Sequence, residues 1–280
     1  MLIRFYLLCL LINGVFAVFA WRNKKKEALE RIVTLTVVLH ILCLALGGGP
    51  YAFALFTAAL LGLGVREITR PLKERSLPWV VAALGWGTLL FLNQGMLTYS
   101  IPLFLLASIT AFAGKKEQVR SRRYLYGFIF LVLAPCAAGL AALYRREGDW
   151  VMALILLLQL NDGLGYHFGK AWGKTKIFQT VSPNKSLEGY GFGLLGLVGG
   201  TVLLYTALPL LKGYSLVQAA LLAGYLFIFG NAGDLLFSAI KRKLEIKDFG
   251  RLLPGHGGVL DRFDNILFTA PVLYLLVQGW

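Results

Sequence analysis

The chain has 280 residues, of which 58% are hydrophobic and 15% are charged, and its mean hydropathy is +0.69. A soluble domain is about 45–50% apolar and about 25% charged, so this composition excludes an ordinary soluble protein and indicates an integral membrane protein. The net charge of +14 is explained by basic cytoplasmic loops; because no recognised nucleic-acid-binding motif accompanies it, we expect no nucleic-acid partner.

Apolar blocks that could cross a bilayer recur along the whole chain. About 20 apolar residues span a bilayer as a helix. The candidate spans are residues 2–21, 32–46, 50–65, 79–93, 98–114, 124–144, 150–169, 190–211, 215–233 and 264–280. Because several are short or contain Gly and Pro, nine or eight spans are alternatives to ten. The predicted fold is therefore all-α, a polytopic transmembrane bundle of about nine or ten helices.

The division of the chain follows from these spans. The first block lacks a clear signal-peptide cleavage site, so we expect it to be retained as a helix. No connecting loop is long enough for a soluble domain. We expect one membrane unit, with N-terminal transmembrane helices in residues 1–145 and a C-terminal transmembrane region in residues 146–280 that carries the candidate catalytic side chains.

The basic residues provide a test of the spans. Of the 28 Lys and Arg, 24 lie in alternate loops. These loops cover residues 22–31, 66–78, 115–123, 170–189 and 234–263. Basic loops face the cytoplasm, so we expect both chain termini on the opposite side of the membrane.

One polar stretch interrupts the apolar sequence near its end. Residues 231–265 hold four Asp, six Lys or Arg, one His and five Gly. The residues spaced to share one face of a helix are Asp234, Ser238, Lys241 and Arg242. An acid at the end of an apolar run is costly unless it is paired or binds a cation. The structural alternative for Asp234 is a pair with Lys241 or Lys243.

A glycine-rich turn and a second acidic pair follow. The turn is Pro254-Gly255-His256-Gly257-Gly258, after Lys247-Asp248 and before Asp261, Arg262 and Asp264. Glycines let the backbone approach a phosphate, and successive N–H groups can hold it. Mg²⁺ prefers oxygen ligands and usually keeps waters and substrate phosphates. The stretch therefore predicts a site for a polyphosphate and a divalent cation.

These residues resemble the signature of the phosphatidate cytidylyltransferases, also called CDP-diacylglycerol synthases. The matching positions are Ser238, Lys241-Arg242, Lys247-Asp248, Pro254, His256-Gly257-Gly258, Asp261-Arg262 and Asp264. A second block resembles another segment of that family: Asp162, Tyr166, Ser182-Pro183-Asn184-Lys185 and Glu188-Gly189. Lys170, Ser186 and Leu187 differ from the residues common there. The N-terminal half is similar only as a run of membrane helices.

The resemblance implies that CTP and phosphatidate react to CDP-diacylglycerol and pyrophosphate, a step of phospholipid biosynthesis. It also implies Mg²⁺, with Mn²⁺ and a second or monovalent cation left open. We expect the metal ligands to be Asp234 and Asp261, supported by Asp264 or Asp248. The candidate catalytic residues are Lys241, Arg242, Lys247, Asp248, His256 and Arg262. The candidate substrate-binding residues are Asp162, Ser182, Lys185, Ser238, Gly257 and Gly258.

Other interpretations stay open at this point. A CTP-dependent lipid kinase of the dolichol or phytol type would transfer the γ-phosphoryl group instead. A transporter would show inverted repeats and broken helices at matching places, and neither is evident. Asp162 could form a structural pair within its span. The resemblance further suggests a homodimer, and the compact chain is typical of a bacterial inner-membrane protein whose site faces the cytoplasm.

Overall fold

The computed structural model describes residues 2–22, 26–72, 75–206, 208, 210–211, 213–255 and 257–280. Its helices are α1 (Leu2–Arg22), α2 (Lys26–Gly47), α3 (Gly49–Thr69), η1 (Arg70–Leu72), α4 (Ser76–Leu92), α5 (Gln94–Ala113), α6 (Lys116–Val119), α7 (Arg122–Phe128), η2 (Ile129–Leu133), α8 (Ala134–Arg146), α9 (Gly148–Trp172), α10 (Leu187–Thr206), α11 (Leu216–Lys243) and α12 (Leu260–Gln278). The described residues contain two isolated β-bridges and no strand.

The predicted membrane helix bundle is confirmed. Each of the ten predicted spans lies on a helix, with α7, the π-helical turn η2 and α8 forming one span. Within the described residues, six helical segments are long and apolar enough to cross a membrane. α12 has the length, but it begins with Asp261, Arg262 and Asp264. The exact number of spans therefore stays a prediction.

Several helices are longer or shorter than the apolar spans predicted on them. α3 continues to Thr69 and α11 continues to Lys243, beyond the predicted ends at 65 and 233, whereas α10 stops at Thr206 rather than at 211. Charged residues at the end of an apolar run mark the membrane boundary but do not stop a helix, because Lys, Arg and Glu are good helix formers. The extension of α11 places Ser238, Lys241 and Arg242 on the helix that also carries Asp234.

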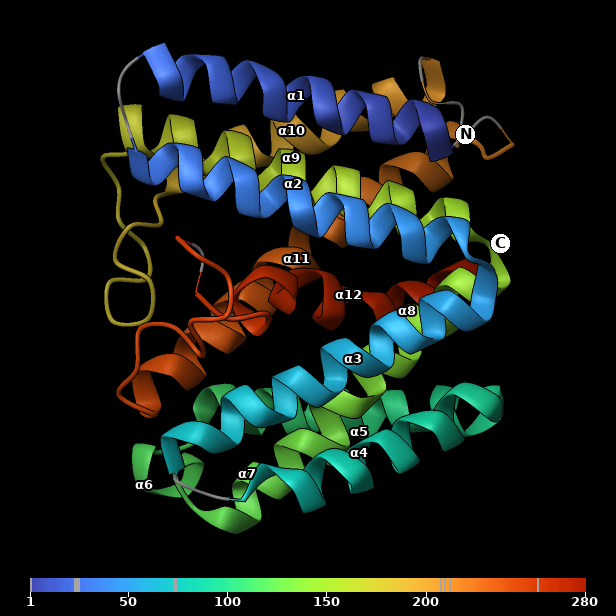
Figure 1. Ribbon diagram of the computed structural model, residues 1–280, viewed down its shortest axis with the longest axis vertical. Helices are drawn as coiled ribbons and strands as arrows, with labels where there is room; N and C mark the ends of the chain where they lie inside the picture. The colour runs from blue at the N-terminus through green and yellow to red at the C-terminus, as the bar shows by residue number, and fades with distance from the viewer. Residues whose placement is uncertain are drawn as a thin grey trace.

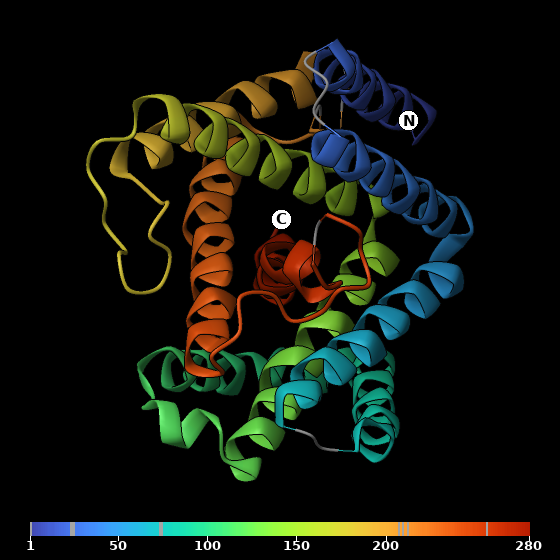
Figure 2. The same ribbon diagram turned by 60° about the vertical axis from the view of Figure 1, so that its left-hand side comes forward.

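α12 is the central helix of the bundle. Figure 2 shows it in the middle, with the other helices arranged around it. It packs against α8 and α11, and also against α9, α3 and α5. Most of its side chains are buried, and Asp264 and Asn265 are among them. Polar groups in such a position are costly unless they have partners or a function.

The helices run back and forth between two ends of the molecule. Figure 1 shows both termini at one end, and the α9–α10 and α11–α12 connections together at the other. We call this second end the basic end, because its loops, in residues 173–186 and 244–259, belong to the segments that are rich in Lys and Arg. The arrangement agrees with the prediction that both termini lie on the same side.

Glycines bring α9 and α10 into close contact. A Cβ atom on Gly169 would lie 3.0 Å from the Cα of Gly189, and one on Gly193 would lie 2.7 Å from the side-chain oxygen of Asn161. Small residues let membrane helices approach at the level of the backbone. This packing fixes α9, and with it Asp162, relative to the start of α10.

Candidate active site

The polar face of α11 meets the segment between α9 and α10. Ser238 Oγ donates to Asp234 Oδ1 at 3.3 Å, as their spacing on one helical face predicts. Lys185 Nζ lies 2.5 Å from Asp234 Oδ2, and Arg242 Nε donates to the carbonyl oxygen of Val181 at 3.3 Å. The structure thus brings the two predicted sequence blocks together. Asp234 pairs with Lys185, and not with Lys241 or Lys243 as the structural alternative required.

Lys185 is held between an acid and an aromatic ring. Its ammonium group lies 5.3 Å from the centre of the Tyr190 ring and 3.4 Å from the Tyr190 hydroxyl. Burial, the largest single effect, lowers the pKa of Lys185, but Asp234, Tyr190 and Asp162 together outweigh it, so the pKa is raised overall. Lys185 is therefore a cation held in place beside Asp234.

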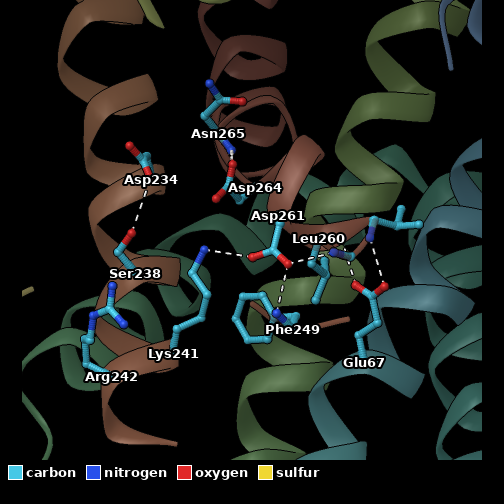
Figure 3. Close-up of polar contacts among 12 residues, drawn as sticks. Glu67, Asp234, Ser238, Lys241, Arg242, Phe249, Leu260, Asp261, Asp264 and Asn265 are labelled. Atoms are coloured by element: carbon cyan, nitrogen blue, oxygen red, sulfur yellow. Dashed lines mark hydrogen bonds and ion pairs between the residues drawn. The ribbon is translucent and has the colours of Figure 1, made fainter. Parts of the chain in front are cut away.

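Asp261 has nearly all of its acceptor positions filled. Its Oδ1 accepts from Lys241 Nζ at 2.8 Å, and its Oδ2 accepts from the backbone N–H groups of Phe249 and Gly258, both at 2.8 Å. Figure 3 shows this side chain directed at Lys241 and Phe249. The Asp261 side chain is 3% exposed and that of Lys241 is 12% exposed. A carboxylate offers about four lone-pair positions, and three of those on Asp261 are occupied. The main role of Asp261 is therefore to hold the preceding loop against α12, and we call a carboxylate with this role a clamp.

The glycine-rich turn packs on this clamp. Gly257 has φ +87°, and a Cβ atom there would lie 2.9 Å from Asp261 Oδ2, so only glycine fits. The N–H of Leu253 donates to the carbonyl oxygen of Gly257 at 2.9 Å and closes the turn. The N–H of Gly258, predicted to be available to a phosphate, donates to Asp261 instead. His256 lies outside the described residues.

A carboxylate from the N-terminal half completes the loop. Glu67 of α3 accepts from the N–H groups of Val259 and Leu260 at 2.8 and 2.9 Å. Figure 3 shows it approaching from the side opposite α11. Sequence reasoning missed this residue because the third span was predicted to end at 65, which assigned Glu67 to a loop. The available signal was an acid directly after an apolar run, between Arg66 and Arg70.

Three other acids converge from three helices. We call Asp162 of α9, Asp234 of α11 and Asp264 of α12 the acidic trio. They lie close enough to repel one another electrostatically. Asp162 accepts hydrogen bonds from the side-chain amides of Asn161 and Asn265. These two Asn side chains, which sequence reasoning did not single out, hold Asp162 in place.

Asp264 is the most deeply buried member of the trio. It is 7% exposed, and its Oδ1 accepts from the backbone N–H of Asn265 at 2.8 Å. Asp234 carries the ion pair with Lys185. The trio therefore concentrates negative charge where α9, α11 and α12 meet, an arrangement that attracts a further cation.

Most of the chain resembles proteins of one family. A family model described as "Cytidylyltransferase family" matches residues 29–280. The chain belongs to the cytidylyltransferase family. Proteins named "Phosphatidate cytidylyltransferase" are similar to it over nearly their full length. The protein of Staphylococcus saprophyticus is 31% identical over 268 residues, which cover 90% of this chain and 98% of the relative. The proteins of Staphylococcus aureus strain COL and Bacillus subtilis strain 168 are 32% identical over 263 residues and 30% identical over 267 residues, which cover 90% and 89% of this chain and 98% and 97% of the relatives.

The family match extends the resemblance that the motifs suggested. The motifs lie in the C-terminal half, whereas the family match begins at residue 29 and includes Glu67. The contact between Glu67 and the start of α12 gives a physical reason why this cytidylyltransferase needs its N-terminal helices at the site. Besides crossing the membrane, these helices hold the loop before α12 in position through Glu67.

Two members of the acidic trio carry the kind of oxygen ligand that a hard divalent cation prefers. No group of three His, Cys, Asp or Glu in the described part of the chain forms a metal site by itself. Mg²⁺ does not require one, because it is usually bound by one or two carboxylates plus waters and substrate phosphates. The oxygen donors of Asp234 and Asp264 suit this chemistry, and the Lys185 ammonium group lies where a cation would meet Asp234.

The remaining predicted residues lie at the basic end. Lys247, Asp248 and Arg262 are exposed, and Ser182 is half-buried. The carbonyl oxygen of Ser182 accepts from the N–H of Lys185 at 3.1 Å, which forms the turn that presents Lys185. Gly258 is buried beneath the loop. The roles predicted for these five residues stay predictions.

Proposed function

We propose that the protein transfers the cytidylyl group of CTP to phosphatidate and produces CDP-diacylglycerol and pyrophosphate. The observation that carries this proposal is the ion pair between Lys185 and Asp234, which joins the two sequence blocks that resemble the family signature into one site next to Asp264. The names of the family relatives point to the same reaction. They do not favour the lipid-kinase alternative.

The chemistry requires little proton transfer. An oxygen of the phosphatidate phosphate, already an anion, attacks the α-phosphorus of CTP. A new phosphorus–oxygen bond forms, the bond between the α-phosphorus and the oxygen bridging to the β-phosphorus breaks, and pyrophosphate leaves with the bonding electrons. The barrier comes mainly from bringing two polyanions together, so fixed cations and positioning supply most of the catalysis.

Two basic side chains and a bound metal ion would share the neutralisation of the substrate phosphates. Arg242 extends from α11 toward the turn that carries Lys185, and both side chains are placed to contact substrate phosphates. Asp234 and Asp264 would hold Mg²⁺, which when bound neutralises the triphosphate. Lys185 can then turn from Asp234 to a phosphate. Asp261, whose oxygens already accept three hydrogen bonds, supports this arrangement as a clamp, which revises the predicted ligand pair.

The two substrates fit the basic end. CTP is soluble and phosphatidate is a membrane lipid, so the site must lie where water meets the bilayer. The concentration of Lys and Arg in alternate loops supports a cytoplasmic orientation, and the bacterial relatives support a bacterial inner membrane. A homodimer remains a prediction.

One assay tests the reaction directly. Purified protein in detergent is incubated with phosphatidate, Mg²⁺ and CTP labelled either at the α-phosphorus or, in a parallel reaction, at the γ-phosphorus. We expect only the α-label in a lipid product, with one pyrophosphate released for each labelled lipid. Label that enters lipid only from the γ-position would establish a kinase, and no transfer from either position would refute both reactions. Glu117→Gln, an exposed acid on α6, is the matched control for acid substitutions in the site.

A further inference from the structure

Glu67 joins the N-terminal half to the loop that precedes α12. It is separated by 192 and 193 residues from the two backbone groups that it binds. We infer that Glu67 is a positioning residue for nucleotide binding: it holds residues 249–255 and 257–260 in the shape that receives CTP. This inference rests on the proposed function and adds to it a residue outside the sequence motifs.

Glu67 accepts hydrogen bonds from backbone N–H groups at the start of α12. The first N–H groups of a helix have no partner within the helix and attract a negative charge. Val259 and Leu260 donate two of them to the two oxygens of Glu67, which is only 7% exposed. A buried carboxylate with two short N–H donors has one orientation, so it fixes the position of the helix start.

The loop also closes tightly around this carboxylate. A Cβ atom on Gly250 would lie 2.4 Å from Glu67 Oε1, and one on Gly258 would lie 2.5 Å from both Glu67 oxygens. The backbone therefore lies against the Glu67 carboxylate at two places, at Gly250 after Lys247-Asp248 and at Gly258 at the end of the glycine-rich turn. The path of both predicted nucleotide-binding segments depends on the position of one side chain.

Glu67 and Asp261 share the same run of backbone donors. The N–H of Gly258 goes to Asp261, and the next two N–H groups go to Glu67. Asp261 in turn holds Lys241. Loss of Glu67 would leave two buried donors unpaired, and the helix start could then shift relative to Lys241 and Asp264.

A second contact from the N-terminal half acts on the same loop. Thr34 Oγ1 of α2 donates to the carbonyl oxygen of Pro254 at 3.0 Å. The glycine-rich turn is thus held at Pro254 by α2, while the residues that follow it are held by α3. Two helices without motif residues determine the shape of the motif loop.

The test uses Glu67→Gln, which keeps the size of the side chain but replaces one acceptor oxygen with an N–H donor. We expect the KM for CTP to rise by about tenfold or more, because a charge-assisted hydrogen bond is lost, while the KM for phosphatidate changes less than about twofold. A purely structural role would reduce the fraction of folded enzyme, which lowers the apparent kcat and leaves both KM values unchanged. That result would overturn the inference.

Controls separate this inference from the reaction itself. Glu117→Gln should leave both KM values unchanged. If Glu67→Gln does not fold, Thr34→Val, which removes the hydrogen bond to Pro254, decides: we expect a selective rise of a few fold in the KM for CTP, and unchanged KM values would refute the inference. If the wild-type protein transfers no α-label to lipid, the proposed function fails, whatever the variants show.

Discussion

Two sets of carboxylates lie within the same site and differ in how their oxygens are used. Glu67 and Asp261 each accept two backbone N–H groups, and Asp261 also binds Lys241. In the acidic trio, Asp234 instead pairs with Lys185, and Asp264 accepts one backbone N–H. An acid near a membrane helix is therefore not a metal ligand merely because of its position. The number of hydrogen-bond donors around it distinguishes a clamp from a binding group.

The largest effect should come from the acidic trio. Asp264→Asn removes a carboxylate that would hold the metal, so we expect the transfer of label from CTP to lipid to fall more than about a hundredfold. The thermal midpoint should not decrease, because repulsion from Asp162 and Asp234 is relieved. Initial rates and thermal unfolding in detergent measure the two effects. Near-normal rates would remove Asp264 from the metal site.

Asp261 should show the opposite pattern, with stability as the main loss. Asp261→Ala leaves the buried Lys241 and two N–H groups without their acceptor, and breaking a buried pair on one side costs about 3–5 kcal/mol. Unfolding by denaturant measures the loss. Combining it with Lys241→Met should recover part of the stability, because the unpaired charge is removed. If Asp261→Ala is as stable as wild type but loses metal binding, the two sets of carboxylates do not differ as described.

Lys185 should contribute stability over a wide pH range. Its pKa is raised above the ordinary lysine value; a raised pKa means that the stabilisation is complete below the ordinary value and is lost as pH rises through the higher one. For this partly exposed pair we expect Lys185→Met to cost about 1 kcal/mol at pH 7. Thermal midpoints of the two proteins, measured from pH 7 to 11, should converge only at the alkaline end. Convergence near neutral pH would contradict the ion pair.

The smallest effect should come from Glu245, an exposed acid that follows α11. It pairs with Lys116 and Arg120, and these contacts, first the hydrogen bond from Lys116, lower its pKa. Its contribution is therefore present above the ordinary glutamate pKa and is lost as pH falls through the lowered value. Because exposed ion pairs contribute little, Glu245→Gln should shift the thermal midpoint by at most about 2 °C at pH 7. A larger shift would show that α6 supports the site.

Much of the architecture could be predicted from the sequence because bilayers impose strong rules. Long apolar blocks must form helices, and their basic loops indicate a common side. The spacing of Asp234 and Ser238 predicted a shared helical face, and the structure confirms it. The same spacing predicted that α11 continues past its apolar span to Lys241, whereas the continuation of α3 to Glu67 was not predicted.

The sequence by itself determined the fold class, the family and the residues that meet at the basic end, because apolar length and motif spacing are local properties. Only the tertiary structure decided which acid does what. Asp261 and Asp264 are three residues apart in the same helix, yet one meets Lys241 and the loop amides while the other faces α9 and α11. Hydrogen-bond donors that arrive from distant segments, such as those that meet Glu67, cannot be read from local spacing.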